Sequence, residues 1–360
     1  MSQAELKREV RRRVQAKTPD SSLHTVLKDI VLNDTHPPCG VAVVIPCYNS
    51  ALCLARAIES VFAQTYRDYR IYVIDDGSTD GTEEVLRSYD KRAVCVRQPH
   101  AGQGAARNHG IRLSNSAYVA FLDADDEWLP NKLERSIEIL QQDPSVGLVY
   151  SDCLTSGTGP FAGSHFARIG TPASGRVFVQ LLDNCNVFTP TVVVRRKCLE
   201  DVGAFSESLA VGEDLNLWLR IAARWEFAVA LEVLAIRHRR PGSLSQTTSV
   251  DLALSSSLAA VEHVAETCPH LPAHERDALR KSIANRHYEY GSYLLRIGGR
   301  APCRRQMFEA VRWGRCDWRV VTKTALSFLP HRTFAALREF RQNLGRPRLE
   351  EARSRDHASQ

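Results

Sequence analysis

Short apolar runs alternate with helical segments between residues 41 and 142, and this alternation is the strongest limit on how the chain can fold. The first run, residues 41–45, is rich in β-branched side chains and is typical of a strand that helices cover on both faces. Three more runs of strand length follow, at residues 70–74, 93–97 and 118–122. Strands that alternate with helices usually pair in parallel, so we expect an α/β fold with a mostly parallel central sheet flanked by helices.

Turn residues and later apolar runs set the other element boundaries. We expect Pro46 to end the first strand, and Asn49 with Ser50 to cap a helix over residues 51–63. Residues 155–174 are rich in Gly, Ser and Thr without a clear period, which favours a loop. Further strands are expected at residues 146–151, 191–195 and 227–236, and a helix at 211–220.

The sequence predicts four parts. Residues 1–38 form an N-terminal helical arm, residues 39–248 the α/β domain, residues 249–349 a helical basic region, and residues 350–360 a disordered tail. The formal net charge of the whole chain is +6. Residues 296–349 contain 13 Lys or Arg and 3 Asp or Glu, so the basic character belongs to the C-terminal region.

Cysteine usage and hydropathy bear on the compartment. The ten cysteines include no C-x-x-C pair, which gives a zinc site no support, and several lie in apolar runs as expected in a reducing compartment. Residues 1–15 are charged and lack the apolar core of a signal peptide. No run approaches the roughly 20 apolar residues that span a bilayer. We expect a cytoplasmic protein, either free or bound peripherally to the inner face of the plasma membrane.

Four acids follow the fourth apolar run within five residues: Asp123, Asp125, Asp126 and Glu127. A strand that ends in carboxylates places them at the carboxyl edge of the sheet, where ligands bind in open α/β folds. Carboxylates this close repel one another unless a cation joins them, and their hard oxygens suit Mg²⁺ or Mn²⁺. An acidic turn that caps the next helix is the alternative interpretation. Asp126 and Glu127 are expected to be turn and helix-start residues, where mutation costs less.

Three other polar groups are candidates for ligand chemistry. Asp76, at the end of the second run, can accept hydrogen bonds from a nucleobase or a ribose, although its Asp-Gly-Ser surroundings also suit an ordinary turn. Residues 102–107 imperfectly match a dinucleotide-binding fingerprint; a flexible turn that lets Arg107 reach a phosphate is the better interpretation. Asp214, beside Glu213, can act as a general base, although acids are also common in a first helical turn.

Five segments in this order resemble family-2 glycosyltransferases, which have the Rossmann-like GT-A fold. The segments are VVIPCYN, ending at Asn49, DDGSTDGT, ending at Thr82, GAARNHG, ending at Gly110, FLDADD, ending at Asp126, and GEDLNLWLR, ending at Arg220. Each is weak alone, but together they cover roughly residues 40–245. The resemblance implies an inverting enzyme that uses one base and no enzyme nucleophile.

The resemblance also implies individual roles. It assigns Mn²⁺ or Mg²⁺ binding to Asp125 with Asp123, which form the D-x-D motif, and deprotonation of the acceptor hydroxyl to Asp214. Asp76 would contact the base, usually uracil. Donor binding falls to Pro46, Tyr48, Asn49, Asp76, Arg107 and Asp123. The Q-x-x-R-W motif of processive synthases is absent, which favours transfer of a single sugar. Many relatives have His where this chain has Arg240, so no role passes to His238.

We therefore expect single-sugar transfer, with inversion, from a nucleotide-diphosphate sugar, most often UDP-linked, to a glycan or lipid-linked acceptor in cell-surface polysaccharide synthesis. The alternatives are a nicotinamide-dependent oxidoreductase that uses residues 102–107, and a non-catalytic nucleotide-sugar or membrane-binding protein. Residues 296–349 mix cations with bulky apolar side chains and could bind an anionic membrane surface, or form a helical subdomain that packs those side chains inward. Nucleic acid is not an expected partner, because no recognition motif accompanies the charge.

Overall fold

A computed structural model of the 360-residue chain describes residues 39–157, 162–239, 247–329 and 333. The predicted arm at 1–38 and tail at 350–360 lie outside the described residues. The chain divides into two compact units, Met1–Leu279 and Arg280–Gln360. This division lies later than the predicted boundary at residue 248, and the four-part organisation stays a prediction.

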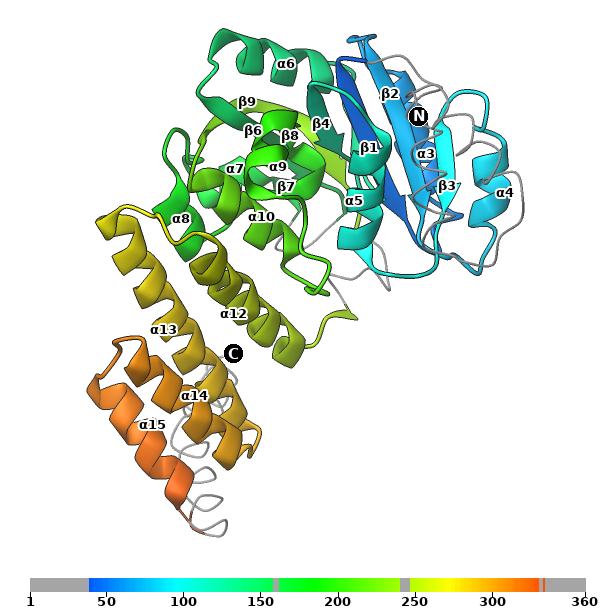
Figure 1. The fold of residues 1–360 in the computed structure, drawn as a ribbon. Helices are drawn as coiled ribbons and strands as arrows, with labels where there is room; N and C mark the ends of the chain where they lie inside the picture. Colours follow the sequence, from blue (N-terminus) through cyan, green and yellow to red (C-terminus); the bar gives the residue numbers. More distant parts are fainter. Residues whose placement is uncertain (1–38, 158–161, 240–246, 330–332, 334–360) are drawn as a thin grey trace, which may run out of the picture. The chain divides into compact units, whose positions relative to one another are not determined.

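The first unit is built on one nine-stranded sheet with the order β3-β2-β1-β4-β8-β6-β9-β5, to which β7 is added beside β6 (Figure 1). Strands β1, β2, β3 and β4 are parallel, as are β6 and β9, whereas β8 runs antiparallel to both β4 and β6. The prediction of a mostly parallel central sheet is confirmed. The strands are β1 Val41–Cys47, β2 Tyr69–Asp75, β3 Val94–Arg97, β4 Tyr118–Phe121, β5 Glu127–Trp128, β6 Val146–Thr155, β7 Gly163–Ser164, β8 Val193–Arg195 and β9 Glu226–Arg237.

Helices cover both faces of β1, which explains why every residue of this strand is buried. Val43 packs in the cluster that contains Ile58 of α3, while Ala42 packs in the one that contains Ala106 of α5. Alternate residues of a strand point to opposite faces, so a strand covered twice must be apolar throughout. On the α5 side, Gly110 allows close packing, because a Cβ there would lie 2.5 Å from Cγ1 of Val44.

The helices of this unit follow the strands in alternation, as expected. Two of them, α8 and α9, were not predicted, and residues 155–174 contain β7 and α7 rather than only loop. The bounds are α3 Leu54–Phe62, α4 Thr82–Arg87, α5 Gln103–Leu113, α6 Lys132–Gln142, α7 His165–Ile169, α8 Phe178–Asp183, η1 Thr189–Thr191, α9 Arg196–Val202, α10 Glu213–Ala222 and α12 Val250–Thr267.

Two boundary predictions around the first strand are wrong. Pro46 lies inside β1, which continues to Cys47. Proline is tolerated there because the β4 partner has ended its pairing at Val44, so the missing N–H is on the unpaired side. Asn49 and Ser50 do not cap α3, which begins only at Leu54 after a turn.

The described part of the second unit is helical, as predicted. It includes most of α13 (Ala273–Arg296), then α14 (Arg300–Arg312) and α15 (Trp318–Phe328). A small core joins these helices, with Leu295, Cys303, Met307 and Val320 among its buried members. Among the described helices, none combines the length and the apolar composition needed to cross a bilayer.

Candidate active site

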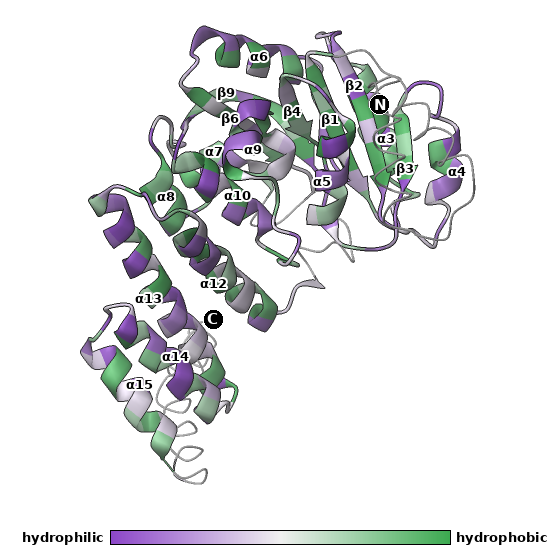
Figure 2. Ribbon diagram, viewed as in Figure 1, coloured by the Kyte–Doolittle hydropathy of each residue, from purple (hydrophilic) through white to green (hydrophobic). Residues whose placement is uncertain are grey.

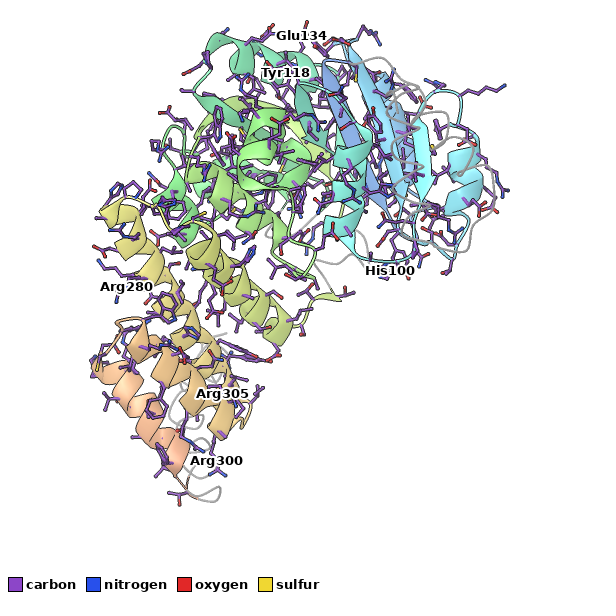
Figure 3. All side chains as sticks on the ribbon, viewed as in Figure 1. His100, Tyr118, Glu134, Arg280, Arg300 and Arg305 are labelled. Carbon is purple, nitrogen blue, oxygen red and sulfur yellow. The ribbon has the colours of Figure 1, made fainter. Side chains whose placement is uncertain are left out.

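A cavity of about 810 Å³ lies at the carboxyl ends of the parallel strands. This is the edge where open α/β sheets bind ligands, because the turns that follow the strands converge there. In Figure 3, His100 marks this end of the sheet, opposite Tyr118 at the start of β4. The predicted site residues that line the cavity are Pro46, Tyr48, Asp76, Arg107, Asp123, Asp125 and Asp214.

Arg107 joins two acidic parts of the site. Arg107 lies one turn after the start of α5 and is only 2% exposed. Its guanidinium donates to Oδ1 of Asp123 at 2.7 Å and to Oε1 of Glu213 at 2.8 Å. Burial alone lowers the pKa of this guanidinium, but the two carboxylates outweigh burial and raise it above its ordinary value. The terminal nitrogens of Arg107 therefore bind carboxylates, not a freely reachable phosphate. A contact between Arg107 and the donor stays a prediction.

The acidic cluster after β4 is crowded, as predicted. The pKa of Asp126 is raised by its burial and then by the charges of Asp123 and Asp125. Asp126 accepts a hydrogen bond from the backbone N–H of His238 at 3.0 Å. The predicted turn is confirmed, because the Asp126 N–H donates to the Asp123 carbonyl at 3.1 Å, although Asp126 is buried. The predicted helix start at Glu127 is wrong, because Glu127 belongs to β5, where its carboxylate meets the His238 ring at 3.1 Å.

The donor set of this cluster fits a hard divalent cation that also binds substrate. Within the residues that the structure describes, no three His, Cys, Asp or Glu side chains are grouped to hold a metal by themselves. Mg²⁺ at nucleotide sites normally takes only one or two carboxylates and completes its shell with phosphate oxygens and water. Asp123 and Asp125, both partly exposed to the cavity, meet that requirement.

Asp76 is buried and holds the segment that follows β3. Its two oxygens accept hydrogen bonds from the backbone N–H groups of Ala101 and Gly102 at 2.9 and 2.8 Å. Gln98 Nε2 donates to the same carboxylate at 2.7 Å, and His100 Nδ1 lies 2.8 Å from it. Of these partners, the half-exposed His100 ring is the one that a ligand could displace most easily.

The cavity mouth carries an aromatic pair. The rings of Tyr48 and His100 are stacked, with centroids 4.3 Å apart, and Tyr48 is 44% exposed. Asn49 is not among the cavity-lining residues. Its Oδ1 accepts a hydrogen bond from the backbone N–H of Thr79 at 2.8 Å, so Asn49 holds the turn after β2, and its contact with a donor stays a prediction.

Asp214 lies in the first turn of α10 and lines the same cavity. Its pKa is raised, chiefly by burial, with the charge of Asp123 adding to the effect while the Leu215 N–H and Arg107 oppose it. A carboxylate with a raised pKa is a stronger base, as general-base catalysis requires. The position and environment of Asp214 are therefore compatible with the predicted role.

Sequence reasoning assigned no function to the two residues after Arg107, yet both organise the site. The Asn108 side chain exchanges two hydrogen bonds with the backbone of Phe205, each 2.9 Å, and donates to Glu207 beside the cavity. His109 Nδ1 lies 2.8 Å from Gln98 Oε1. Because the Gln98 amide nitrogen donates to Asp76, its oxygen must accept the proton of His109. The sequence signal that could have identified Asn108 and His109 is their position directly after Arg107 in the segment GAARNHG.

A further part of the cavity lining was also not predicted. It includes Thr189, Arg237 at the end of β9, and His238 and Arg239 directly after that strand. His238 is fixed there by Glu127 and by Ser156, whose Oγ lies 3.0 Å from its Nδ1.

Comparison with known proteins gives this site a context. The profile of a family described as Glycosyl transferase family 2 matches residues 42–203. The Escherichia coli protein WfgD, named as a UDP-Glc:alpha-D-GlcNAc-diphosphoundecaprenol beta-1,3-glucosyltransferase, is 31% identical over 183 residues, which are 50% of this chain and 69% of that protein. An uncharacterised glycosyltransferase of Rickettsia conorii is 33% identical over 196 residues, 54% of this chain. The chain covers only about a third, 31%, of that Rickettsia protein.

Solved structures share the fold at low sequence identity. S. aureus TarS, residues 1–349 in complex with UDP-GlcNAc, superimposes with a TM-score of 0.62 at 17% identity, over 77% of this chain and 82% of that one. The mannosyltransferase PcManGT from Pyrobaculum calidifontis, in complex with GDP-Man and Mn²⁺, gives 0.53 at 18% identity, over 88% and 92%. The GT-A-type fold expected from the sequence is confirmed.

The chain belongs to glycosyltransferase family 2. The prediction of the family is thus confirmed, while the glycosyltransferase activity and the individual residue roles stay predictions.

Proposed function

We propose that this protein transfers a single sugar, with inversion, from a UDP-linked donor to a glycan or lipid-linked acceptor in cell-surface polysaccharide synthesis. One observation carries the proposal: Asp76, Asp123, Asp125 and Asp214 line one cavity at the carboxyl edge of the sheet. The names of its relatives support the choice of substrates, since WfgD is named for UDP-Glc and a diphosphoundecaprenol-linked GlcNAc, and TarS was solved with UDP-GlcNAc.

The reaction needs a base, a bound donor and a neutralised leaving group. Asp214 takes the proton of the acceptor hydroxyl as its oxygen attacks the anomeric carbon from the side opposite the diphosphate. The bond from that carbon to the diphosphate oxygen breaks, its electron pair leaves with the nucleoside diphosphate, and the configuration inverts. Mn²⁺ or Mg²⁺, when bound by Asp125 and Asp123, would neutralise the leaving diphosphate.

The donor nucleotide is assigned to the β1 and β2 side of the cavity. Pro46 and Tyr48 border it, and Asp76 offers a buried acceptor for the imide N–H of uracil once His100 moves aside. Arg107 positions Asp123 and, through Glu213, the first turn of α10. In this scheme Arg107 links donor binding to the placement of Asp214.

The family assignment replaces the nicotinamide-dependent alternative. Within the match to a dinucleotide fingerprint, Arg107 stands in place of the third glycine, which the fingerprint needs for close packing of the helix on the strand. If the protein were a non-catalytic member of the family, it would bind the donor without transferring the sugar. The experiment below distinguishes this alternative from an active enzyme.

A lipid-linked acceptor needs a protein that reaches a bilayer. We place the protein on the cytoplasmic side, where nucleotide sugars are made, and assign peripheral contact with an anionic membrane to residues 296–349, as expected from their charge.

The proposal is tested by a donor screen. The full-length protein is incubated with a panel of UDP- and GDP-sugars, Mn²⁺, and synthetic acceptors that carry a sugar diphosphate on a short lipid, and products are identified by mass spectrometry. We expect one UDP-sugar to give a product heavier by one sugar residue. Calorimetric binding of UDP with Mn²⁺ but no product from any pair would support the non-catalytic alternative; binding of NADH in preference to UDP would contradict the proposal.

A further inference from the structure

Helix α15 has an exposed apolar face. Trp318, Val321 and Phe328 are 72%, 59% and 65% exposed, and Ala325 between them is also exposed. Residues spaced by three, seven and ten positions lie on one side of a helix, so these four form a continuous strip along α15. Figure 2 shows hydrophobic colours along this helix. We refer to Trp318, Val321, Ala325 and Phe328 as the outer strip.

The outer strip is not the side by which α15 packs into its own unit. Val320 and Ser327 are each 1% exposed, and Val320 belongs to the core shared with Cys303 and Met307 of α14. A helix on a water-facing surface normally has one apolar stripe toward the core and polar residues opposite. Within the described residues, α15 therefore carries apolar side chains beyond those that its core uses, and such exposed patches mark interaction surfaces.

Cations flank the outer strip. From Arg296 to Leu329 the chain has eight Lys or Arg and two acids, Glu309 and Asp317. Both acids already pair with neighbouring arginines, at 3.5 and 3.0 Å.

Two arginines of this region face outward. Arg319 follows Trp318, and Arg305, labelled in Figure 3, lies three residues before the 61% exposed Phe308 on α14; both arginines are exposed. Neither arginine pairs with a carboxylate in the described part of the chain. Each of these two helices thus combines an exposed apolar side chain with an exposed arginine that no carboxylate neutralises in the described residues.

We propose that the outer strip, with Arg305, Phe308 and Arg319, binds the surface of a bilayer that contains anionic lipids. Trp and Phe insert at the boundary between headgroups and acyl chains, while arginines bind lipid phosphates, so both halves of the pattern are used. Each cation at such a surface contributes about fivefold to the partition coefficient. The inference names the residues of the membrane contact proposed above for residues 296–349, and the use of this contact, access to a lipid-linked acceptor, rests on the proposed function.

Charge distinguishes a bilayer from the other occupants of an apolar face. A second copy of the chain would bring the same net positive surface against itself. Residues 334–349, which lie outside the described residues, contain four arginines and one acid, so covering the strip with them would also concentrate like charge. Nucleic acid would use the arginines but gain nothing from Trp318 and Phe328 on an exposed helix. An anionic bilayer complements both features.

The test measures binding of the full-length protein to vesicles by flotation, without donor or acceptor. Vesicles of phosphatidylcholine with 30% phosphatidylglycerol are compared with pure phosphatidylcholine at low salt and at 0.5 M NaCl, where charge attraction is screened. We expect binding only to the anionic vesicles, weakened by salt. The double variants Trp318→Ser/Phe328→Ser and Arg305→Glu/Arg319→Glu should each reduce it by about tenfold or more.

Matched controls lie in the first unit. Leu231 is 71% exposed, and Lys91 is exposed, so Leu231→Ser and Lys91→Glu change apolar and charged surface without touching α14 or α15 and should leave vesicle binding unchanged. Transfer to a water-soluble acceptor should be the same for every variant. Loss of transfer with intact vesicle binding would count against the proposed function only. Failure of the proposed function and failure of the membrane-binding inference can therefore be distinguished.

Three results would overturn the inference. The first is absence of vesicle binding by the unmodified chain, or binding that neither double variant reduces. The second is a change from dimer to monomer in Trp318→Ser/Phe328→Ser by light scattering, which would make a second copy the occupant. The third is an increase in vesicle binding of about threefold or more after removal of residues 334–360, which would show that this segment normally covers the strip.

Discussion

At the residue scale, the surroundings of each carboxylate separate the acids of the site. Asp214 is partly exposed to the cavity, but desolvation of its carboxyl group raises its pKa, so it is suited to accept a proton. Asp125 lies partly exposed in the cavity, where a cation and a diphosphate can reach it. Asp126 beside it is buried and accepts the His238 N–H instead. Neighbouring residues of the same type therefore have different expected costs of mutation.

Asp125→Asn and Asp126→Asn make a matched pair of substitutions. We predict that Asp125→Asn lowers transfer by about a hundredfold or more, because an amide lacks the charge that holds a divalent cation. Asp126→Asn should retain transfer to within about tenfold, because an amide oxygen still accepts the His238 N–H and the raised pKa already favours a neutral group. Initial rates across a Mn²⁺ titration measure both. Equal losses would remove Asp125 from the metal role.

Lys132 is a fully buried cation outside the cavity. Burial lowers its pKa to about 7, and its Nζ donates to the Thr191 carbonyl at 3.0 Å. An unfolded lysine titrates near 10.4, so between pH 7 and about pH 10 the unfolded chain binds a proton that the folded chain does not. The free energy of unfolding therefore rises with pH across this window, by at most about 1.4 kcal/mol per pH unit from this group.

We predict that Lys132→Met removes this dependence. The variant should have its largest stability advantage over the unmodified chain at or below pH 7, and the advantage should shrink as the pH rises toward 10. Urea unfolding curves recorded from pH 6 to pH 9.5 give the difference directly. A difference that does not change with pH would show that Lys132 keeps its charge in the folded protein.

At the element scale, α5 connects the parts of the site. Three consecutive residues link it to different partners: Arg107 to Asp123 and Glu213, Asn108 to the loop at Phe205, and His109 through Gln98 to Asp76. Because a helix turns by 100° per residue, consecutive side chains point in different directions, and one rigid helix can hold three separate walls.

We predict that His109→Ala weakens donor binding more than it slows transfer. Without His109, the Gln98 amide loses the partner that orients it toward Asp76, and loss of one such hydrogen bond corresponds to about threefold to tenfold in the donor Kd. The transfer rate at saturating donor should stay within about threefold. His109→Gln, which can still donate to Gln98, should restore binding. A large fall in rate with an unchanged Kd would mean that His109 acts on another part of the site.

The sequence predicted the positions of those strands and helices whose buried residues form a clear apolar pattern. The residues of β1, β2 and β4 are apolar on both faces, so their runs stand out, and the acids that follow them had to fall at one sheet edge. Helix α8, with only Phe178, Leu181 and Leu182 buried, is too short to give a period. The pairing of Arg107 with Glu213 across 106 residues follows from tertiary packing, which no local pattern encodes.

At the scale of the whole molecule, the end of the α/β domain is the open question. The sequence placed it at residue 248, where strand signals stop. The described structure packs α12 on the helix that carries Asp214: Asn216 Nδ2 donates to the Ala260 carbonyl at 2.9 Å, and Asn216 itself is fully buried. Helix α12 therefore contributes to the stability of α10, although its sequence has the composition of the C-terminal helical region.

Truncation separates the two boundaries. We predict that removal of residues 297–360 leaves calorimetric binding of UDP with Mn²⁺ within about twofold, because the cavity lies wholly in the first unit. Removal of residues 249–360 should abolish it, because the amide nitrogen of the buried Asn216 would lose its partners Ala260 and His263, and α10 would lose its contact with α12. If the chain that ends at residue 248 still bound UDP with Mn²⁺, the result would support a domain boundary at residue 248.

Asp214 is proposed above as the base of a single-displacement transfer. The most direct measurement compares Asp214→Asn with the unmodified chain in two assays on the same preparation: calorimetric donor binding with Mn²⁺, and the rate of transfer at saturating substrates. We predict a donor Kd within about twofold of the unmodified value and a rate lower by about 10² to 10⁴. A rate retained to within about tenfold, or loss of donor binding itself, would contradict the role of Asp214.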